Sequence, residues 1–508
     1  MRFLSCLLLL ALSPAAWAGG DDRPAGSAPD SKLPNILLAI ADDASWPHMS
    51  AYGCRFLKTP NFDRVAREGV LFNNCFTPLP KCSPSRAALL TGRNPWQLEE
   101  ACCHFGLFSA KFPVYPDLLE AAGYYVGFTG KGWAPGNWQK GGFKRNPAGT
   151  EFNKLKAKPP TTGISPIDYA GNFDAFLKDR PRGKPFCFWY GGHEPHRPYE
   201  LGSGVRAGKR LADVGVQPYL PNTDEGRSDI LDYALEIEWF DTHLGRMLKK
   251  LDEIGELDNT IVVVTSDNGM PFPRVKGHIF EDACHLPLAI RWGKSVKGGR
   301  VVDDFVSFID LAPTFAEAAG LQPPAGTTGR SILDLLKSGA SGQVDPKRDH
   351  VLLGRERTDV GRPNDAGYPV RANRTRDYLY ARNFDPDRWP AGNPETGFRD
   401  IDDSPTKALV LKLKEQGQEK YFDLCMGKRP AEELYDLRKD PACVDNLAFN
   451  TDRVAVKARL WAQLEKELRE QQDPRILGKG DIFDRYQYLG ERSHSWDAVM
   501  GGKKPSEK

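Results

Sequence analysis

Short, continuous apolar runs alternate with segments of helical periodicity along the first two thirds of the chain. Continuous apolar runs of this length are typical of strands buried on both faces, and they occupy residues 34–41, 70–76, 124–129, 185–190, 260–266 and 286–292. Helical patterns occupy residues 60–68, 83–91, 115–122 and 228–254. This alternation predicts an α/β domain in which helices flank a large, mostly parallel sheet.

The pattern changes near residue 340. Glycine and proline become frequent, the one clear apolar run shortens to residues 378–382, and a helical pattern at residues 451–471 lies near the end of the chain. We therefore expect the large α/β domain to cover residues 33–344. A smaller α+β domain with a short antiparallel sheet is expected over residues 345–508.

The first residues have the pattern of a secretory signal. Arg2 precedes an apolar run at residues 7–12, and residues 16–18 (Ala-Trp-Ala) match the small-residue pattern of a cleavage site. We predict a signal peptide at residues 1–18, a flexible leader at residues 19–32, and a protein that is periplasmic or secreted. No later apolar stretch is long enough to span a bilayer. The net charge of +2 over 508 residues does not point to a nucleic-acid or membrane-surface partner.

Polar residues follow several of the predicted strands at the point where each strand ends. They are Asp42 and Asp43, Lys131, His193 and His196, and Asp267 and Asn268, while Cys82 precedes a predicted helix. In open α/β sheets, ligands bind beyond the carboxyl ends of the strands. We therefore expect these side chains to converge on one site.

The oxygen-bearing residues of this set fit a hard cation. Asp42, Asp43, Asp267 and Asn268 offer three carboxylates and one amide oxygen. Such a set suits Ca²⁺, or Mg²⁺ as the second choice, and is poor for zinc. Asp-Asp and Asp-Asn-Gly are also ordinary turn sequences after strands. Their occurrence together with the motif around Cys82 favours the metal site.

The segment Cys82-Ser83-Pro84-Ser85-Arg86, with Leu-Thr-Gly-Arg at residues 90–93, resembles the sequence around the nucleophile of type I sulfatases. In that family a formylglycine-generating enzyme oxidises the cysteine to formylglycine (3-oxoalanine), and the hydrated aldehyde attacks sulfur. The second hydroxyl of the hydrate lets sulfate leave by C–O cleavage. The resemblance implies that Cys82 is modified in this way, that the formylglycine oxygen or a substrate oxygen completes the calcium shell around Asp42, Asp43, Asp267 and Asn268, and that the fold is alkaline-phosphatase-like.

The resemblance also implies roles for four other residues. Arg86, one helical turn after Cys82, would neutralise the nucleophile. Lys131 and Lys276 match sulfate-binding lysines, and His196 matches the histidine that protonates the leaving group or binds sulfate. Backbone N–H groups at the start of the helix would add partial positive charge. The base that releases sulfate stays unassigned.

Within the family, the sequence is most similar to the heparan N-sulfatases, or sulfamidases. The matching stretches are residues 37–43, 82–92, 193–197 and 265–273, and residues 308–314 and 433–441 also resemble sulfatase signatures. One departure concerns Trp133, which stands where many members have a histidine. Trp133 would stack on a sugar or belong to the core, and His104, His193 or His278 would supply the missing imidazole.

Substrate contacts are expected from loops and from the smaller domain. The candidates are His104, Trp133, His193, Arg274, Arg355, Tyr368 and Arg371, although charged loop residues are also typical of solvated surfaces. Arginine and tyrosine suit a sulfated, uronate-containing glycan. We therefore favour a glycosaminoglycan, with heparan or heparin N-sulfate as one candidate, over a small aryl or choline ester.

Cysteine pairing is expected because an exported chain can form disulfides. One of the ten cysteines lies in the predicted signal peptide. Cys425 and Cys443 flank a tight unit of the smaller domain and are the pair we predict.

Three other functions remain open. A phosphodiesterase or phosphonate monoester hydrolase can use the same scaffold, in some cases with formylglycine. A non-catalytic protein that binds sulfated glycans could share the fold. A thiol or redox protein could use Cys82 directly, although the sequence has no Cys-x-x-Cys pair.

Overall fold

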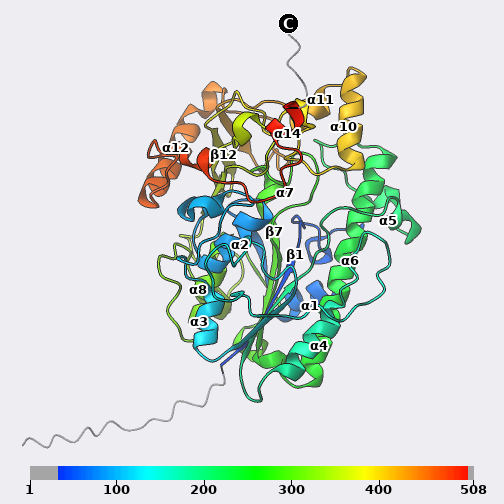
Figure 1. Ribbon diagram of the computed structural model, residues 1–508, viewed down its shortest axis with the longest axis vertical. Coiled ribbons are helices and arrows are strands. Elements are labelled where there is room, and N and C mark those ends of the chain that lie inside the picture. The colour runs from blue at the N-terminus through cyan, green and yellow to red at the C-terminus, as the bar shows by residue number, and fades with distance from the viewer. Residues whose placement is uncertain (1–32, 502–508) are drawn as a thin grey trace, which may run out of the picture. The chain divides into compact units, whose positions relative to one another are not determined.

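The computed structural model describes residues 33–501. The predicted signal peptide and leader lie outside this range. From Pro34 onward the described chain forms one compact unit (Figure 1). Within the described range, no helix combines the length and hydrophobicity needed to cross a bilayer.

Nine strands form the large sheet at the centre of this unit (Figure 1). Their order is β4-β3-β5-β1-β6-β7-β2-β8, with β9 paired to β2. Their bounds are β1 Asn35–Ala41, β2 Val70–Phe76, β3 Tyr125–Gly130, β4 Thr150–Glu151, β5 Phe186–Gly191, β6 Thr260–Ser266, β7 His285–Arg291, β8 Arg300–Val302 and β9 Val306–Ser307. β7 is antiparallel to β6 and β2, and the other pairs are parallel. The predicted, mostly parallel sheet is confirmed.

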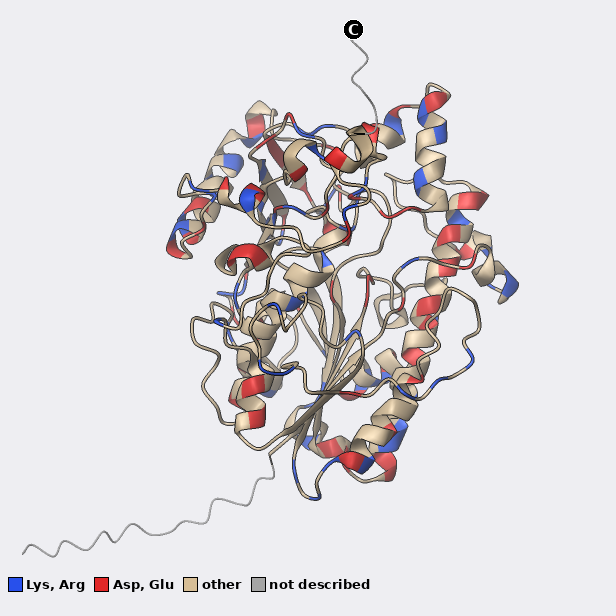
Figure 2. Ribbon diagram, viewed as in Figure 1, with Lys and Arg blue, Asp and Glu red and all other residues tan. Residues whose placement is uncertain are grey.

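Helices cover both faces of this sheet. The helices on one face are α1 (Pro60–Glu68), α4 (Tyr169–Asp179) and α6 (Asp224–Glu253), and those on the other are α2 (Cys82–Thr91), α3 (Tyr115–Ala121) and α8 (Leu311–Ala318). In β1, Leu37 and Ala39 pack toward the first group, and Ile36 and Leu38 toward the second. Both faces of the strand are therefore apolar. Figure 2 shows the charged residues gathered on helices and loops.

A smaller antiparallel sheet follows in the order β10-β11-β12-β13. Its strands are β10 His350–Arg355, β11 Val370–Thr375, β12 Tyr378–Asn383 and β13 Glu432–Asp436, and α12 (Val454–Glu470) packs against it. The remaining helices are α5 Ser203–Arg206, α7 Glu281–Cys284, α9 Leu333–Lys337, α10 Pro405–Glu415, α11 Lys420–Cys425, α13 Ile482–Arg485 and α14 Trp496–Met500. The predicted short antiparallel sheet is confirmed. The core of the large sheet continues into this sheet through Val351 and Leu353, and the division at residues 344 and 345 stays a prediction.

Two differences from the sequence pattern have local causes. α6 begins at Asp224, four residues before the predicted start, because the Thr223 side chain accepts a hydrogen bond from the Gly226 N–H and caps the helix. β11 has no apolar run, since arginine and asparagine side chains alternate with small apolar ones along it, yet most of its residues are buried. Apolar periodicity alone could not locate such a strand.

The predicted disulfide between Cys425 and Cys443 is wrong. Both residues are buried free thiols. The Cys425 thiol faces the carbonyl oxygen of Tyr219 at 3.2 Å. The guanidinium of Arg274 donates hydrogen bonds to the carbonyls of both Leu424 and Cys443. An arginine, and not a disulfide, therefore joins the two segments.

A buried ion-pair network joins the small sheet to the segment after α12. Arg371 of β11 is fully buried, with its guanidinium 2.7 Å from Asp473 and 2.8 Å from Glu356. Glu356 also binds Arg475 at 2.6 Å. Because buried charges are tolerated only when they are paired, each member depends on the others.

Replacement of Arg371 by methionine should therefore destabilise the protein by about 3 kcal/mol, since Asp473 would be left buried without its cation. The urea-unfolding midpoint measures this effect. The matched change Arg438→Met removes an arginine whose side chain is 55% exposed and should cost less than about 0.5 kcal/mol. Equal midpoints for the two variants would contradict the structural role of Arg371.

Candidate functional site

The carboxyl ends of β3, β5, β1 and β6 lie side by side at one edge of the large sheet. The residues that follow these strands are Asp42 and Asp43 (β1), Lys131 (β3), His193 and His196 (β5), and Asp267 and Asn268 (β6). A cavity of about 750 Å³ opens at this edge, and Cys82, Lys131 and His196 line it. The strand-end residues predicted to converge are thus brought together.

A tight turn presents Lys131. Gly130 has a φ of 65°, and a Cβ on it would lie 2.1 Å from the carbonyl oxygen of Gly191 on the neighbouring strand. Only glycine fits there. The Lys131 N–H then donates to the same carbonyl at 2.7 Å. The Gly-Lys-Gly sequence therefore fixes the backbone from which the lysine extends.

Three carboxylates meet at the ends of β1 and β6. Oxygens of Asp42, Asp43 and Asp267 lie within 4.8 Å of one another, and all three residues are buried. Burial, together with the charge of Asp42, raises the pKa of Asp267 to about 7. This crowding of negative charge requires cations nearby.

Arg86 is the most buried of these cations. Its guanidinium donates to Asp267 Oδ2 at 2.9 Å, to Asp42 Oδ1 at 3.4 Å and to the Lys131 carbonyl at 2.5 Å. The side chain is 0% exposed. Arg86 therefore joins the ends of β1, β3 and β6 in one network and does not lie on the surface.

Two lysines complete the network. Lys131 Nζ lies 2.5 Å from Asp42 Oδ2, and Lys276 Nζ lies 2.7 Å from Asp43 Oδ2 and 2.9 Å from Asp402 Oδ2. Although burial opposes it, these carboxylates hold the pKa of each ammonium group above its ordinary value. Ion pairs thus connect four carboxylates with the two lysines and Arg86. When all four carboxylates are ionised, one negative charge remains in excess.

The side chain of Asn268 shows that this cluster fits a divalent cation. Its Nδ2 donates to Asp43 Oδ1 at 2.7 Å. Its Oδ1 is buried and accepts no hydrogen bond from any described residue. Buried polar atoms are normally satisfied, and a carbonyl oxygen beside three carboxylates is the environment that Ca²⁺ or Mg²⁺ prefers. A divalent cation would also turn the excess negative charge into a positive one.

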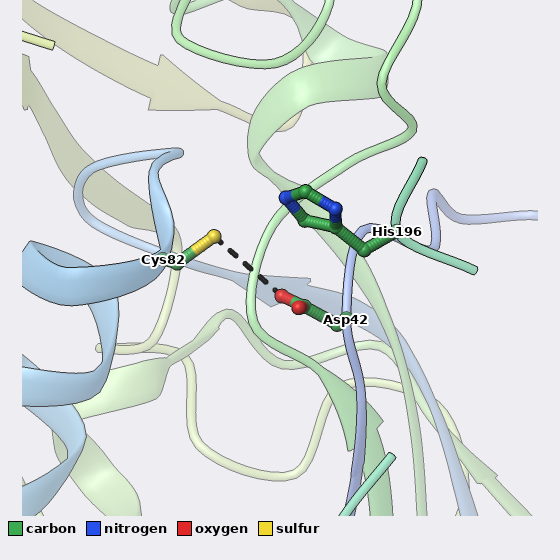
Figure 3. Close-up of side chains that lie close together, drawn as sticks. All are labelled: Asp42, Cys82 and His196. Atoms are coloured by element: carbon green, nitrogen blue, oxygen red, sulfur yellow. Dashed lines mark hydrogen bonds between the residues drawn. The ribbon is translucent and has the colours of Figure 1, made fainter. Parts of the chain in front are cut away.

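Cys82 begins α2 beside these carboxylates. Figure 3 shows its thiol pointing toward Asp42, with an Sγ–Oδ1 distance of 3.5 Å. Burial and the charge of Asp42 raise the pKa of the thiol to about 12. One turn later, the Ser85 hydroxyl donates to the Asp267 carbonyl at 2.6 Å and holds the helix against the end of β6.

His196 faces the cluster from the end of β5 (Figure 3). Its Nδ1 donates to the Arg197 carbonyl at 2.7 Å, so Nε2 is the nitrogen that faces the site, 3.9 Å from Asp43 Oδ2. The positive charge of Lys276 and burial lower the pKa of His196. The imidazole is therefore neutral without a ligand.

Of the other candidate histidines, two line the cavity and one does not. His104 and His193 line the cavity, and burial lowers the pKa of His193 to about 4. His278 is 2% exposed and does not line the cavity. Trp133 also lines it, while its ring packs against Phe143 and its Nε1 donates to the Gly136 carbonyl at 2.8 Å. Trp133 is thus partly core and partly cavity wall.

Four predicted substrate contacts do not reach the cavity. Arg274, Arg355, Tyr368 and Arg371 are at most 2% exposed, and none lines the cavity. Arg274 binds backbone carbonyls, and Arg355 lies 2.7 Å from Asp400. That part of the prediction is wrong, because these side chains serve the fold.

The cavity residues that were not found from the sequence include four charged ones: Lys81, Glu236, Asp359 and Asp402. Lys81 is 3% exposed, and its positive charge acts on Asp359 and Asp402. Its position before Cys82 was the only available signal. Both carboxyl oxygens of Glu236 are buried without a hydrogen bond, and burial raises its pKa to about 9. The two aspartates come from distant segments without a motif.

Comparisons with known sequences place the chain in a family. Residues 34–321 match the family described as Sulfatase. An ulvan-active sulfatase of Formosa agariphila is 29% identical over 87% of this chain and 81% of its own length. The human N-sulphoglucosamine sulphohydrolase is 28% identical over 89% of this chain and 93% of its own length.

Solved structures show the same fold. BT4656 in complex with its substrate D-glucosamine-2-N,6-O-disulfate has a TM-score of 0.64 and 21% identity, over 87% of this chain and 99% of that one. The phosphonate monoester hydrolase of Agrobacterium radiobacter has a TM-score of 0.65 and 20% identity, over 86% and 96%. The alkaline-phosphatase-like architecture is thereby confirmed. The family match covers more than half of the chain and includes the cysteine motif and the acidic cluster, so the chain belongs to the sulfatase family of hydrolases.

Proposed function

We propose that this sulfatase hydrolyses sulfate ester or sulfamate groups of a sulfated glycan with a formylglycine formed from Cys82. The observation that carries the proposal is the position of Cys82. Its Sγ lies 3.5 Å from Asp42 Oδ1, at the start of α2, between the acidic cluster and the cavity. Formylglycine would supply, as its hydrate, a hydroxyl nucleophile and a second hydroxyl for sulfate release. Because Cys82 is 5% exposed, a formylglycine-generating enzyme would act before the chain folds.

The proposed metal is Ca²⁺, with Mg²⁺ as the second choice. Asp42, Asp43, Asp267 and Asn268 would hold it, together with the oxygen of modified residue 82. The metal would supply Lewis acidity at the sulfate group. One net positive charge of the loaded cluster would be balanced by one singly charged sulfate ester or sulfamate.

The cations of the chain would bind and neutralise the sulfate group. Lys131 follows β3 and Lys276 lies beyond β6, and these strands are on opposite sides of β1. The two ammonium groups therefore flank residue 82 and would stabilise charge on the non-bridging oxygens. Arg86 would hold the nucleophile in place, and the free N–H groups at the start of α2 would add partial positive charge.

His196 is the proposed proton carrier. Its Nδ1 is fixed by a backbone carbonyl, so Nε2 would exchange a proton with the departing oxygen or nitrogen. The bound anion would raise the affinity of Nε2 for that proton. The resemblance around residues 193–197 implies this role for His196, and the orientation of the ring supports it.

A sulfated glycan is the proposed substrate class. The cavity volume lies in the range of about 300–1,000 Å³ that is typical of small-ligand sites, and Trp133 and Phe105 in its wall offer ring faces for a sugar. Proteins of similar sequence include an ulvan-active sulfatase and the human N-sulphoglucosamine sulphohydrolase. Export by the predicted signal peptide, to the periplasm or outside the cell, would bring the enzyme to such a polymer.

A phosphonate monoester or phosphodiester hydrolase is the alternative, because a phosphonate monoester hydrolase shares the fold. The metal-loaded cluster, with one net positive charge, would also suit a phosphate diester, which carries one negative charge. Relative rates on 4-nitrocatechol sulfate and on a phosphate diester separate the two functions. Direct thiol chemistry is disfavoured, since a thiol with a pKa of about 12 is not ionised at neutral pH.

Protein produced with a formylglycine-generating enzyme should carry formylglycine at position 82 and release sulfate from 4-nitrocatechol sulfate. Cys82→Ala should abolish release, because no nucleophile remains. Peptide mass spectrometry and a sulfate assay measure the two effects. Cys75→Ala, a change at a buried cysteine away from the cavity, serves as the control. Full activity of unmodified protein would overturn the proposal.

Lys276→Met should lower kcat/KM for an aryl sulfate by about 100-fold or more, because one cation that stabilises the transition state is lost. Steady-state kinetics give the value. Lys294→Met, at an exposed surface position, should leave kcat/KM within about twofold. A similar small effect at Lys276 would exclude it from sulfate binding.

Calcium should raise the melting temperature of protein stripped with a chelator, since the ion binds only the folded cluster. Asn268→Ala removes one neutral ligand and should require about tenfold more Ca²⁺ for the same rise. Asn450→Ala, at an exposed helix cap, is the matched control. A calcium response unchanged by Asn268→Ala would place the ion elsewhere.

A further inference from the structure

The C-terminal segment 486–496 returns to the cavity. The N–H of Leu489 donates to the Phe105 carbonyl at 2.9 Å, and the ring of Tyr488 packs edge-on against Phe105 with centroids 5.5 Å apart. Phe105 lines the cavity. The end of the described chain therefore supports one wall of the proposed substrate site.

The same segment holds Asp359, another residue of that wall. Asp359 Oδ1 accepts hydrogen bonds from the Val360 N–H at 2.8 Å and from the Tyr488 hydroxyl at 3.1 Å. His494 Nε2 lies 3.8 Å from the same oxygen. No described residue donates to Oδ2, and Oδ2 is not among the buried polar atoms without a partner. One carboxylate oxygen is thus fixed by protein donors, while the other is open to the cavity.

Asp365 provides a comparison, because its contacts are those of a purely structural aspartate. Asp365 also binds the C-terminal segment, and it uses both oxygens, one for Arg492 and one for the Trp496 N–H. It does not line the cavity. Asp359 differs in both respects, because it keeps one acceptor free and directs it toward the substrate site.

Charges around Asp359 keep it ionised. Although burial opposes it, the nearby His494 imidazole and the charge of Lys81 hold the pKa of Asp359 below its ordinary value. An ionised carboxylate only accepts hydrogen bonds. It therefore favours a hydroxyl, an ammonium group or an amide N–H, and it repels a sulfate or a carboxylate.

We propose that Asp359 is a specificity-determining residue that binds a hydrogen-bond donor of the sugar carrying the scissile sulfate, and that segment 486–496 holds it in position. A sugar with a hydroxyl or N–H at this place is accepted, and one with a second sulfate there is rejected. The inference rests on the proposed function. Recognition of this kind raises specificity because a bound substrate that covers this acceptor without donating to it pays a desolvation penalty.

The test compares a sugar substrate with an aryl substrate that has no hydrogen-bond donor. Glucosamine N-sulfate, N-acetylglucosamine 6-sulfate and N-acetylgalactosamine 6-sulfate are screened, and the fastest is compared with 4-nitrophenyl sulfate. Asp359→Asn should raise KM for the sugar about 10- to 100-fold, with kcat/KM for 4-nitrophenyl sulfate unchanged within about twofold. Tyr488→Phe removes a donor to Oδ1 and should shift KM in the same direction by a smaller factor.

Tyr486→Phe is the matched control, because its hydroxyl makes no hydrogen bond with a described residue and does not line the cavity. Its kinetics should equal those of the unchanged enzyme, and thermal melting verifies the folding of every variant. Equal losses on sugar and aryl sulfate, or no loss on either, would overturn the role of Asp359. So would an enzyme that cleaves 4-nitrophenyl sulfate but none of the sugars.

Inactivity of the formylglycine-bearing enzyme on every sulfate would instead refute the proposed function, and this inference with it. A second measurement uses the 2-N,6-O-disulfate of glucosamine beside the N-sulfate. The preference of the enzyme for the singly sulfated sugar should fall in Asp359→Asn. An unchanged preference would overturn the proposed exclusion of a second sulfate.

Discussion

The contacts of Arg86 are the constraint on which the rest of the site depends. The ends of β1 and β6 bring Asp42 and Asp267 together in a region closed to solvent, where like charges repel strongly. Arg86 lies between them and also holds the backbone at Lys131. Because its planar guanidinium has several donors in fixed directions, one side chain can serve three strands at once. A lysine could not do so.

This arrangement connects chemistry to the fold. The strands place the carboxylates in one layer, and α2 supplies both Arg86 and Cys82 from a single turn. The residue that compensates the acidic cluster is therefore rigidly attached to the proposed nucleophile position. Movement of α2 would therefore both break the ion pairs of Arg86 and displace Cys82. The Ser85 hydroxyl, bound to the Asp267 carbonyl, restrains the same turn from the other side. The ion pairs of Arg86 and the hydrogen bond of Ser85 therefore hold the site in a preorganised geometry.

Sequence patterns predicted the strand-end residues and Arg86 because their positions follow from neighbouring residues in the chain. Apolar runs mark strands buried on both faces, and a parallel sheet places their carboxyl ends together. Asp42, Lys131 and Asp267 could therefore be assigned to one edge from their positions after strands. Arg86 could be oriented from its spacing to Cys82 along one helix. These inferences need no knowledge of how distant segments pack.

The remainder depends on distant partners that no local pattern reveals. Arg371 and Arg355 look like exposed substrate-binding arginines until Asp473 and Asp400 are known to neutralise them. The disulfide between Cys425 and Cys443 was predicted wrongly for the same reason, because the sequence does not show that Arg274 lies between the two segments. Conversely, Asp402 reaches Lys276 across 126 positions of the chain.

Charge distribution explains why the second part of the chain matters to the site. The residues before position 345 supply the positive charge of the cavity wall near residue 82. This charge suits any singly charged sulfate or phosphate ester and discriminates little between them. Selectivity requires groups that respond to the rest of the substrate. Asp402 pairs with Lys276 and so limits the positive charge, while Asp359 offers an acceptor at the cavity wall. In the proposed function, the strand ends of the large sheet therefore set the reaction type, and the acidic residues that later segments bring to the cavity would narrow the set of anions it can hold.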